Sequence, residues 1–178
     1  MTLLLYLKRT LNTIPVQSLY LLLGTNLGNR IKNLQTSIEL IEKHIGSISA
    51  CSSIYEATAW GFKSNNTFYN QAIKVFTMLS AENSLLEALK IEKEMQRIRT
   101  NIGYSDRIID IDVLFYNYFI IKSETLTVPH PLMHKRMFAL KPMAELDKLF
   151  VHPVENKTIE ELINVCEDGL LVKRTEFQ

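Results

Sequence analysis

Several features that would assign a protein chain to a special class are scarce in this sequence or missing from it. Its 178 residues include two cysteines, Cys51 and Cys166, which form no framework of paired spacings, so we expect free thiols in a reducing compartment. Lysine and arginine (20) almost balance aspartate and glutamate (19), and the net charge of +1 leaves no global basic field to attract nucleic acid or an anionic membrane. Internal repeats and low-complexity tracts are absent, and the length suits one ordinary domain.

A long hydrophobic run is also missing, including at the N-terminus. Residues 1–7 are apolar but too short to cross a bilayer, and Lys8 and Arg9 follow this stretch, whereas a secretory signal peptide carries its basic residues in front. We therefore expect a cytoplasmic protein. Residues 1–17 are interpreted as an N-terminal extension of unknown role (a helix packed on the domain, a contact surface, or a start codon placed too early), and residues 18–178 as a single domain.

The most informative feature that is present is a pair of aspartates inside a strand-like segment, residues 107–115 (Arg-Ile-Ile-Asp-Ile-Asp-Val-Leu-Phe). Side chains alternate between the two faces of a strand, so Asp110 and Asp112 are predicted to project from the same face. Two like charges on a half-buried face need a positive partner, either arginine or a metal ion. Two carboxylates are too few to enclose Ca²⁺, but they suit Mg²⁺, which keeps water and shares phosphate oxygens. A structural Asp–Arg pair is the alternative.

Basic residues flank this pair in the sequence and predict a polyphosphate site. Arginine offers forked donors to phosphate oxygens, and Mg²⁺ can bridge those oxygens to carboxylates. The chain has no P-loop, because the glycine-containing segment 24–28 lacks the Lys-Ser/Thr ending that a P-loop requires. Phosphate would instead be held by a metal and by side chains. The flanking basic residues are Arg97, Arg99, Arg107, His130 and Arg136.

The order of the predicted elements indicates an α+β domain. Period-two and apolar runs alternate with helical spacing, and Asn29 and Ser80 are suitable N-caps for two helices. The resulting β-α-β-β-α-β order is that of the ferredoxin-like fold, an antiparallel sheet with helices on one face, here followed by additional C-terminal helices. Strands are expected at residues 18–23, 48–57, 68–78 and 107–115, and helices at residues 31–45, after residue 80, and near 132–140, 142–146 and 158–166.

Five short blocks carry a more specific signal: Leu23–Arg30, Ser52–Glu56, Phe68–Ala72, Glu92–Asp112 and Leu126–Phe138. Motifs such as Gly-Thr-Asn or Asp-x-Asp are weak by themselves. The ordered set, with Arg-x-Arg, Arg-x-x-Asp-x-Asp and Val-Pro-His-Pro…Arg-x-Phe, is highly specific. Through these blocks the chain resembles the 6-hydroxymethyl-7,8-dihydropterin pyrophosphokinase family of folate biosynthesis.

The resemblance implies an enzyme that transfers the terminal two phosphates of ATP, as one unit, to the pterin hydroxymethyl group and releases AMP, with two Mg²⁺ ions. It implies that Asp110 and Asp112 bind the metal and that both aspartates, with Arg97 and Arg99, are catalytic. The residues implied to bind ATP are Glu92, Arg97, Arg99, Tyr104, Arg107, Thr127, His130 and Arg136. Those implied to bind the pterin are Thr58, Ala59, Trp60, Phe68, Asn70, Asp110 and Phe138.

Structural interpretations of these residues stay open beside the functional ones. Phe68 alone would be read as core, Glu92 as a helix-surface ion pair, and Trp60 as either a lid over a ligand or a cover for the core. The chain also departs from the family pattern within residues 100–106, where many relatives carry an additional basic residue, a tryptophan and Gly-Pro. We therefore expect fewer positive charges over the phosphates.

Two other classes of function are considered. An RNA-binding module of ferredoxin-like topology would have exposed sheet aromatics amid a basic face and an RNP motif, and neither occurs in this sequence. A catalytically silent pterin- or nucleotide-binding protein is left open by the altered residues 100–106. We expect ATP and a hydroxymethyl dihydropterin as small-molecule partners, no nucleic acid or membrane partner, and a monomer.

Overall fold

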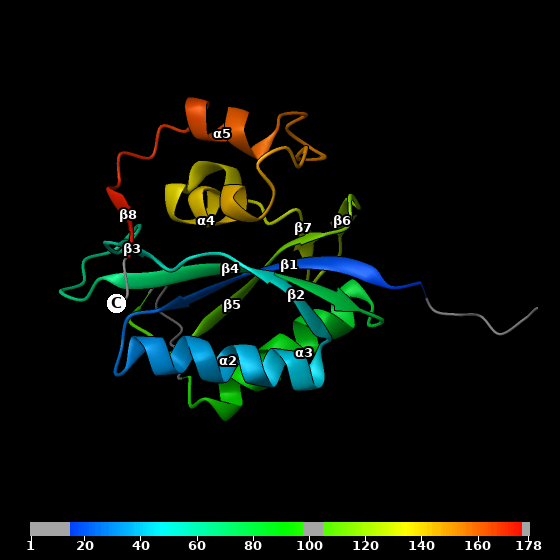
Figure 1. Cartoon of the computed structure of the whole chain (residues 1–178), viewed down its shortest axis with the longest axis horizontal. Helices are drawn as coiled ribbons and strands as arrows, with labels where there is room; N and C mark the ends of the chain where they lie inside the picture. The colour runs from blue at the N-terminus through cyan, green and yellow to red at the C-terminus, as the bar shows by residue number, and fades with distance from the viewer. Residues whose placement is uncertain (1–14, 98–104, 176–178) are drawn as a thin grey trace, which may run out of the picture.

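The computed structural model describes residues 15–97 and 105–175 of the chain as a three-layered arrangement (Figure 1). A central sheet separates α2 and α3 on one face from α4 and α5 on the other. Within the described residues no helix is both long and apolar enough to cross a membrane. The elements are β1 (Gln17–Thr25), α2 (Arg30–His44), β2 (Ser47–Cys51), β3 (Tyr55–Ala57), β4 (Phe68–Thr77), α3 (Ala81–Glu94), β5 (Asp110–Tyr116), β6 (Ile121–Lys122), β7 (Thr127–Val128), η1 (Met133–Lys135), α4 (Met137–Asp147), α5 (Ile159–Val165) and β8 (Val172–Arg174).

The main sheet has the strand order β5-β1-β4-β3-β8, and β2 also pairs with β4. All of its pairings are antiparallel, which confirms the predicted antiparallel α+β architecture. Strand β1 lies between β5 and β4, so the aspartate-bearing strand is at the edge of the sheet. The short strands β6 and β7 form a separate two-stranded sheet.

The single strand predicted over residues 48–57 is wrong, because the chain forms β2 and β3 with a break between them. The break lies at Ser52, whose Oγ accepts a hydrogen bond from the backbone N–H of Ala72 at 3.0 Å, while its own N–H donates to the Ala72 carbonyl at 2.9 Å. The Ser52 hydroxyl thus replaces a backbone carbonyl as the acceptor for the Ala72 N–H of β4. The register of pairing with β4 differs by one residue between β2 and β3. The C-terminal strand β8, which was not predicted, pairs with β3.

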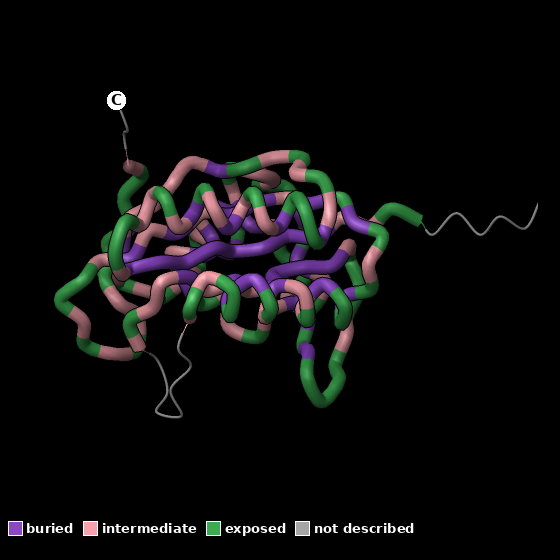
Figure 2. Tube along the Cα trace, turned by 90° about the horizontal axis from the view of Figure 1, so that it is seen from below, coloured by how far each residue is buried: buried purple, intermediate pink, exposed green. Residues whose placement is uncertain are grey.

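Two apolar clusters pack against the opposite faces of the sheet. Leu19, Leu21 and Leu23 point to the cluster under α2 and α3, whereas Tyr20 and Leu22 point to the cluster under α4 and α5. Because both faces are covered, the run of residues 19–23 is apolar at every position, as expected for a fully buried strand. Figure 2 views the molecule from below Figure 1, from the side of α2 and α3, and shows buried strands between partly exposed helices.

The helix starts follow the predicted caps. The Asn29 side chain accepts a hydrogen bond from the N–H of Lys32, and the Ser80 side chain accepts one from Asn83. The two short helical segments predicted at 132–140 and 142–146 are corrected to the single turn η1 followed by a continuous α4 that contains Pro142. Pro142 removes one helical hydrogen bond, but the buried face of α4 packs on the sheet and keeps the helix unbroken.

Candidate active site

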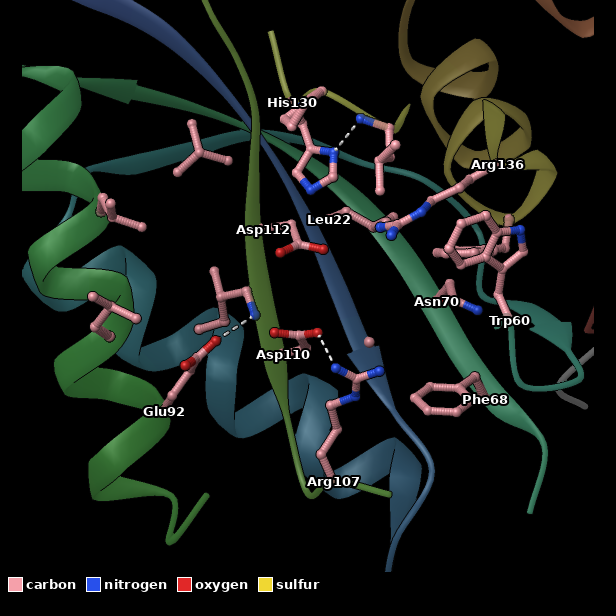
Figure 3. Close-up of a pocket in the computed structure, with 18 of the residues that line it drawn as sticks. Leu22, Trp60, Phe68, Asn70, Glu92, Arg107, Asp110, Asp112, His130 and Arg136 are labelled. Atoms are coloured by element: carbon pink, nitrogen blue, oxygen red, sulfur yellow. Dashed lines mark hydrogen bonds and ion pairs between the residues drawn. The ribbon is translucent and has the colours of Figure 1, made fainter. Parts of the chain in front are cut away.

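A cavity of about 650 Å³ lies where β1 ends and where β4 and β5 begin (Figure 3). This volume is within the range of small-molecule binding sites. The walls come from β1, β4, β5, α3, the loop after β3, residues 125–132 and the start of α4. Because β5 is an edge strand, the cavity reaches around it from the face of α4 to the side chains of α3.

The strand register places a glycine of the cavity wall between an amide and a carboxylate. Gly24 pairs with Asn70 on one side and with Asp110 on the other, and Leu22 pairs with Asp112. A Cβ atom at Gly24 would lie 3.4 Å from Oδ1 of Asn70 and 3.8 Å from Cβ of Asp110. The missing side chain leaves open the space between the amide and the carboxylate.

The prediction that the two aspartates share a face is confirmed, because their carboxylates project from the same side of β5 (Figure 3), whereas Ile111 and Val113 belong to the apolar cluster under α2 and α3. Oδ1 of Asp110 lies 2.5 Å from Nη1 of Arg97, and Oδ2 lies 2.7 Å from Nη1 of Arg107. Among residues 15–97 and 105–175, no hydrogen bond or ion pair reaches the carboxylate of Asp112. Burial, reinforced by the charge of Asp110, raises the pKa of Asp112 to about 7.

Glu92 is buried, with 2% of its surface exposed, so the alternative interpretation as a helix-surface ion pair is wrong. Its Oε1 accepts a hydrogen bond from the N–H of Ile111 at 2.9 Å, and its carboxylate pairs with the guanidinium of Arg97. The carboxylate therefore covers the free edge of β5 and holds Arg97 beside Asp110.

The acidic residues fit a metal ion that shares its ligands with a substrate. No group of three or more histidine, cysteine or carboxylate side chains able to hold a metal occurs in the described part of the chain. Asp110 and Asp112 nevertheless offer oxygen ligands on one face, and Asp112 carries its charge at an energetic cost without a cation. Such a pair suits Mg²⁺, because this ion keeps several waters and takes further oxygens from phosphates.

His130 and Arg136 line the cavity on the side of α4. Nδ1 of His130 accepts a hydrogen bond from the N–H of Leu132 at 3.2 Å. Burial and the charge of Arg136 lower the pKa of His130 to about 4, so the ring is neutral at pH 7 and carries its proton on Nε2. His130 can therefore donate one hydrogen bond to a ligand, while Arg136 supplies positive charge.

Aromatic rings and an amide form the other half of the cavity. Phe68 and Asn70 project from β4, and the guanidinium of Arg107 lies 5.2 Å from the centre of the Phe68 ring. Arg136 lies 4.4 Å from the Trp60 ring and 5.7 Å from the Phe138 ring. Nδ2 of the buried Asn70 has no hydrogen-bond partner among the described residues. A buried amide without an acceptor indicates a site for a polar ligand edge.

A sequence model of the family described as 7,8-dihydro-6-hydroxymethylpterin-pyrophosphokinase matches residues 20–148, more than half of the chain. This chain belongs to that family. A member of the pyrophosphokinase family from Aquifex aeolicus is 37% identical over 144 residues, covering 81% of this chain and 89% of the relative. A folic acid synthesis protein of Pneumocystis carinii is 40% identical over 148 residues, which cover 83% of this chain but 20% of that longer protein.

Solved structures agree with the family at the level of the fold. An HPPK-DHPS crystal structure with bound substrates aligns with a TM-score of 0.71 at 16% identity, covering 84% of this chain and 43% of that one. The Plasmodium falciparum HPPK-DHPS structure with pteroate aligns with a TM-score of 0.70 at 20% identity, over 84% and 44% of the two chains. This chain thus spans less than half of these structural relatives.

Most of the residues that the pyrophosphokinase family implied are brought together in one cavity. Ala59 is not part of its wall, and Arg99 and Tyr104 lie outside the described residues. The lining also includes Phe62, Leu85 and Leu89, which were missed although the two leucines share a helical face with Glu92 and Phe62 follows Trp60 by two residues. The implied residues found in the wall are Thr58, Trp60, Phe68, Asn70, Glu92, Arg97, Arg107, Asp110, Asp112, Thr127, His130, Arg136 and Phe138.

Proposed function

We propose that this chain transfers pyrophosphate from ATP to 6-hydroxymethyl-7,8-dihydropterin, producing the pterin diphosphate and AMP. Pyrophosphoryl transfer in folate biosynthesis is the activity of the family to which the chain belongs. The observation that carries the proposal is that one cavity contains two different kinds of binding group. An aspartate pair with arginines faces an aromatic pocket that contains an unpartnered amide.

The pterin is assigned to the half of the cavity around Asn70. Phe68 and Phe138 offer rings against a planar bicycle, and Nδ2 of Asn70 can donate to an acceptor on its edge. Thr58 and Trp60 line the same half from the loop after β3. Ala59, which is outside the cavity wall, would contribute to pterin binding through its backbone alone.

ATP is assigned to the half with the positive charges. Arg97, Arg107 and Arg136 can donate to phosphate oxygens, and neutral His130 adds one donor from Nε2. Two of these arginines pair with Asp110, so their charges are already desolvated and held in place for a phosphate. Arg99, Tyr104 and Thr127 complete the nucleotide site that the family resemblance implies.

Asp110 and Asp112 would hold Mg²⁺ in this reaction, two ions being the number that the family resemblance implies. When bound, the metal supplies positive charge to the transferred phosphates and lowers the pKa of the attacking hydroxyl. The high pKa of Asp112 supports this assignment, because a cation would remove the cost of ionising a half-buried carboxylate beside Asp110. Glu92 lines the cavity and holds Arg97 in position through their ion pair.

The finer description of the fold belongs to the same proposal. The strand order β5-β1-β4-β3, with α2 and α3 on one face, supports the ferredoxin-like assignment, and β8 extends the sheet beyond that pattern. Strands from Gln17 to Arg174 share one sheet, which supports a single domain over residues 18–178.

The test measures AMP released from ATP and Mg²⁺, with and without the hydroxymethyl dihydropterin. We expect pterin-dependent AMP from the wild-type chain and a loss of about 100-fold or more in Asp110→Ala. Glu160→Gln, which removes a carboxylate outside the cavity wall, is the matched control and should retain full activity. ADP as the product would indicate a γ-phosphoryl kinase. Tight pterin binding without turnover would indicate a catalytically silent binder.

A further inference from the structure

The carboxylate of Asp106 joins three segments that are distant in the sequence. Its Oδ1 accepts hydrogen bonds from Oγ of Ser64 at 2.6 Å and from Nδ2 of Asn26 at 2.7 Å. Its Oδ2 accepts a third bond from Nδ2 of Asn66 at 3.4 Å. Asp106 does not line the cavity. These bonds therefore serve the arrangement of the chain around the site rather than direct contact with a ligand.

The side of this junction at Asn26 is rigid. Asn26 is 3% exposed, its Oδ1 accepts from the N–H of Arg107 at 2.7 Å, and its own N–H donates to the Arg107 carbonyl at 3.1 Å. Asp106 is thereby attached to the end of β1, directly beside the arginine that pairs with Asp110. The hydrogen bonds of Asn26 thus fix the position of the Asp106 carboxylate.

The other side of the junction is the loop of residues 58–67, between β3 and β4. At its far end, Nη1 of Arg30 donates to the carbonyl of Thr67 at 2.9 Å, and the middle of the loop is held by Ser64 and Asn66 on Asp106. The same loop carries Trp60 and Phe62 into the cavity wall, on either side of Gly61, whose φ of 77° is unfavourable for other residues. Loop position and cavity shape are therefore linked.

We propose that Asp106 is a positioning residue that sets the loop of residues 58–67 over the pterin half of the cavity. This inference rests on the proposed function. Removal of the carboxylate breaks the bonds to Ser64 and Asn66 and leaves Ser64 with the long 3.5 Å bond from Nδ2 of Asn26. Asn26 still holds Arg107, so the phosphate half keeps its geometry. The change should weaken binding of the pterin in the ground state and in the transition state alike, which raises its KM and leaves kcat in place.

Two variants of Asp106 separate the hydrogen bonds from the charge. Asp106→Ala should raise the pterin KM about tenfold with the ATP KM within about twofold. Asp106→Asn keeps one acceptor oxygen and should remain close to the wild type. Glu124→Gln removes a charge from the exposed turn between β6 and β7 and is the matched control.

A second readout needs no turnover, because Trp60 is the single tryptophan of the chain. Acrylamide should quench Trp60 fluorescence more strongly in Asp106→Ala and in Ser64→Ala than in the wild type, and the double variant should equal the stronger single one. Unchanged quenching together with an unchanged pterin KM would overturn the proposal. A joint fall of kcat, of kcat/KM for both substrates and of the unfolding temperature would also overturn it. If the wild type released no AMP, the proposed function would fail, whereas quenching and pterin titration would still decide the role of Asp106.

Discussion

Replacement of His152 by asparagine is expected to make the stability of the protein less sensitive to acid. His152 is 2% exposed, between α4 and α5, and its Nδ1 accepts hydrogen bonds from the N–H groups of Val154 and Glu155 at 3.2 and 3.1 Å. Burial, reinforced by His134, lowers the pKa of His152 to about 4, although the charge of Glu155 opposes the shift. The native state therefore requires a neutral ring.

The size of the effect follows from the displacement of the pKa of His152 from 6.5 to about 4. This displacement corresponds to roughly 3 kcal/mol of unfolding free energy once the pH is below both values. The folded pKa is lower than the unfolded one, so the unfolded chain binds more protons between these pH values and stability falls as the pH is lowered. Above about pH 6.5 the contribution is constant.

The assay is reversible urea unfolding between about pH 8 and pH 4, with wild type and His152→Asn compared at each pH. The asparagine Oδ1 can accept the same backbone hydrogen bonds but does not titrate. The lost contact with Phe115 therefore lowers the free energy of unfolding by the same amount at every pH, whereas the absence of a titrating ring changes how that free energy depends on pH. His130 titrates in the same range in both proteins and cancels. His44→Asn, at an exposed position in α2, is the control. Parallel pH profiles for wild type and His152→Asn would refute the reasoning.

Three further outcomes are expected. Asp112→Asn should lose about 100-fold or more of the turnover, yet melt at a higher temperature than the wild type at pH 8 without Mg²⁺. The reason is that the pKa of Asp112 is raised from 3.8 to about 7 in the folded chain, so stability is lost between these pH values and the loss is complete at pH 8. A lower melting temperature of the variant would contradict this account. Asn70→Ala should raise the pterin KM about tenfold in steady-state assays while the ATP KM stays constant, and equal changes in both would argue against a pterin-side amide. Thr158→Ala removes the capping box of α5 and should lower the urea-derived free energy of unfolding by about 1 kcal/mol with no change in turnover, whereas an unchanged midpoint would indicate that the cap is redundant.

Predictions that depend on neighbours in the chain agree with the structure. The period-two pattern places Asp110 and Asp112 on one face, and the apolar run of residues 19–23 is a buried central strand. The caps at Asn29 and Ser80 are also where the sequence indicates them. These features follow from backbone geometry within a few residues, which a single sequence contains.

Predictions that depend on distant contacts were incomplete. The break between β2 and β3 arises because Ser52 bonds to Ala72, twenty residues away in the chain. Continuity of α4 through Pro142 comes from packing on the sheet, which outweighs the loss of one hydrogen bond. Glu92 is buried because α3 packs beside β5, where its carboxylate accepts a hydrogen bond from the N–H of Ile111. Propensity cannot indicate any of these contacts.

The sequence by itself determined the family, the antiparallel α+β architecture and the residue types of the site, because ordered motifs and local periodicity are written along the chain. Only the tertiary structure decided how the charges are distributed among those residues. Arg97 and Arg107 neutralise Asp110, whereas burial leaves Asp112 with a pKa near neutrality. The physical reason is that ion pairing and desolvation depend on distances between segments far apart in the sequence, which strand register and helix packing set.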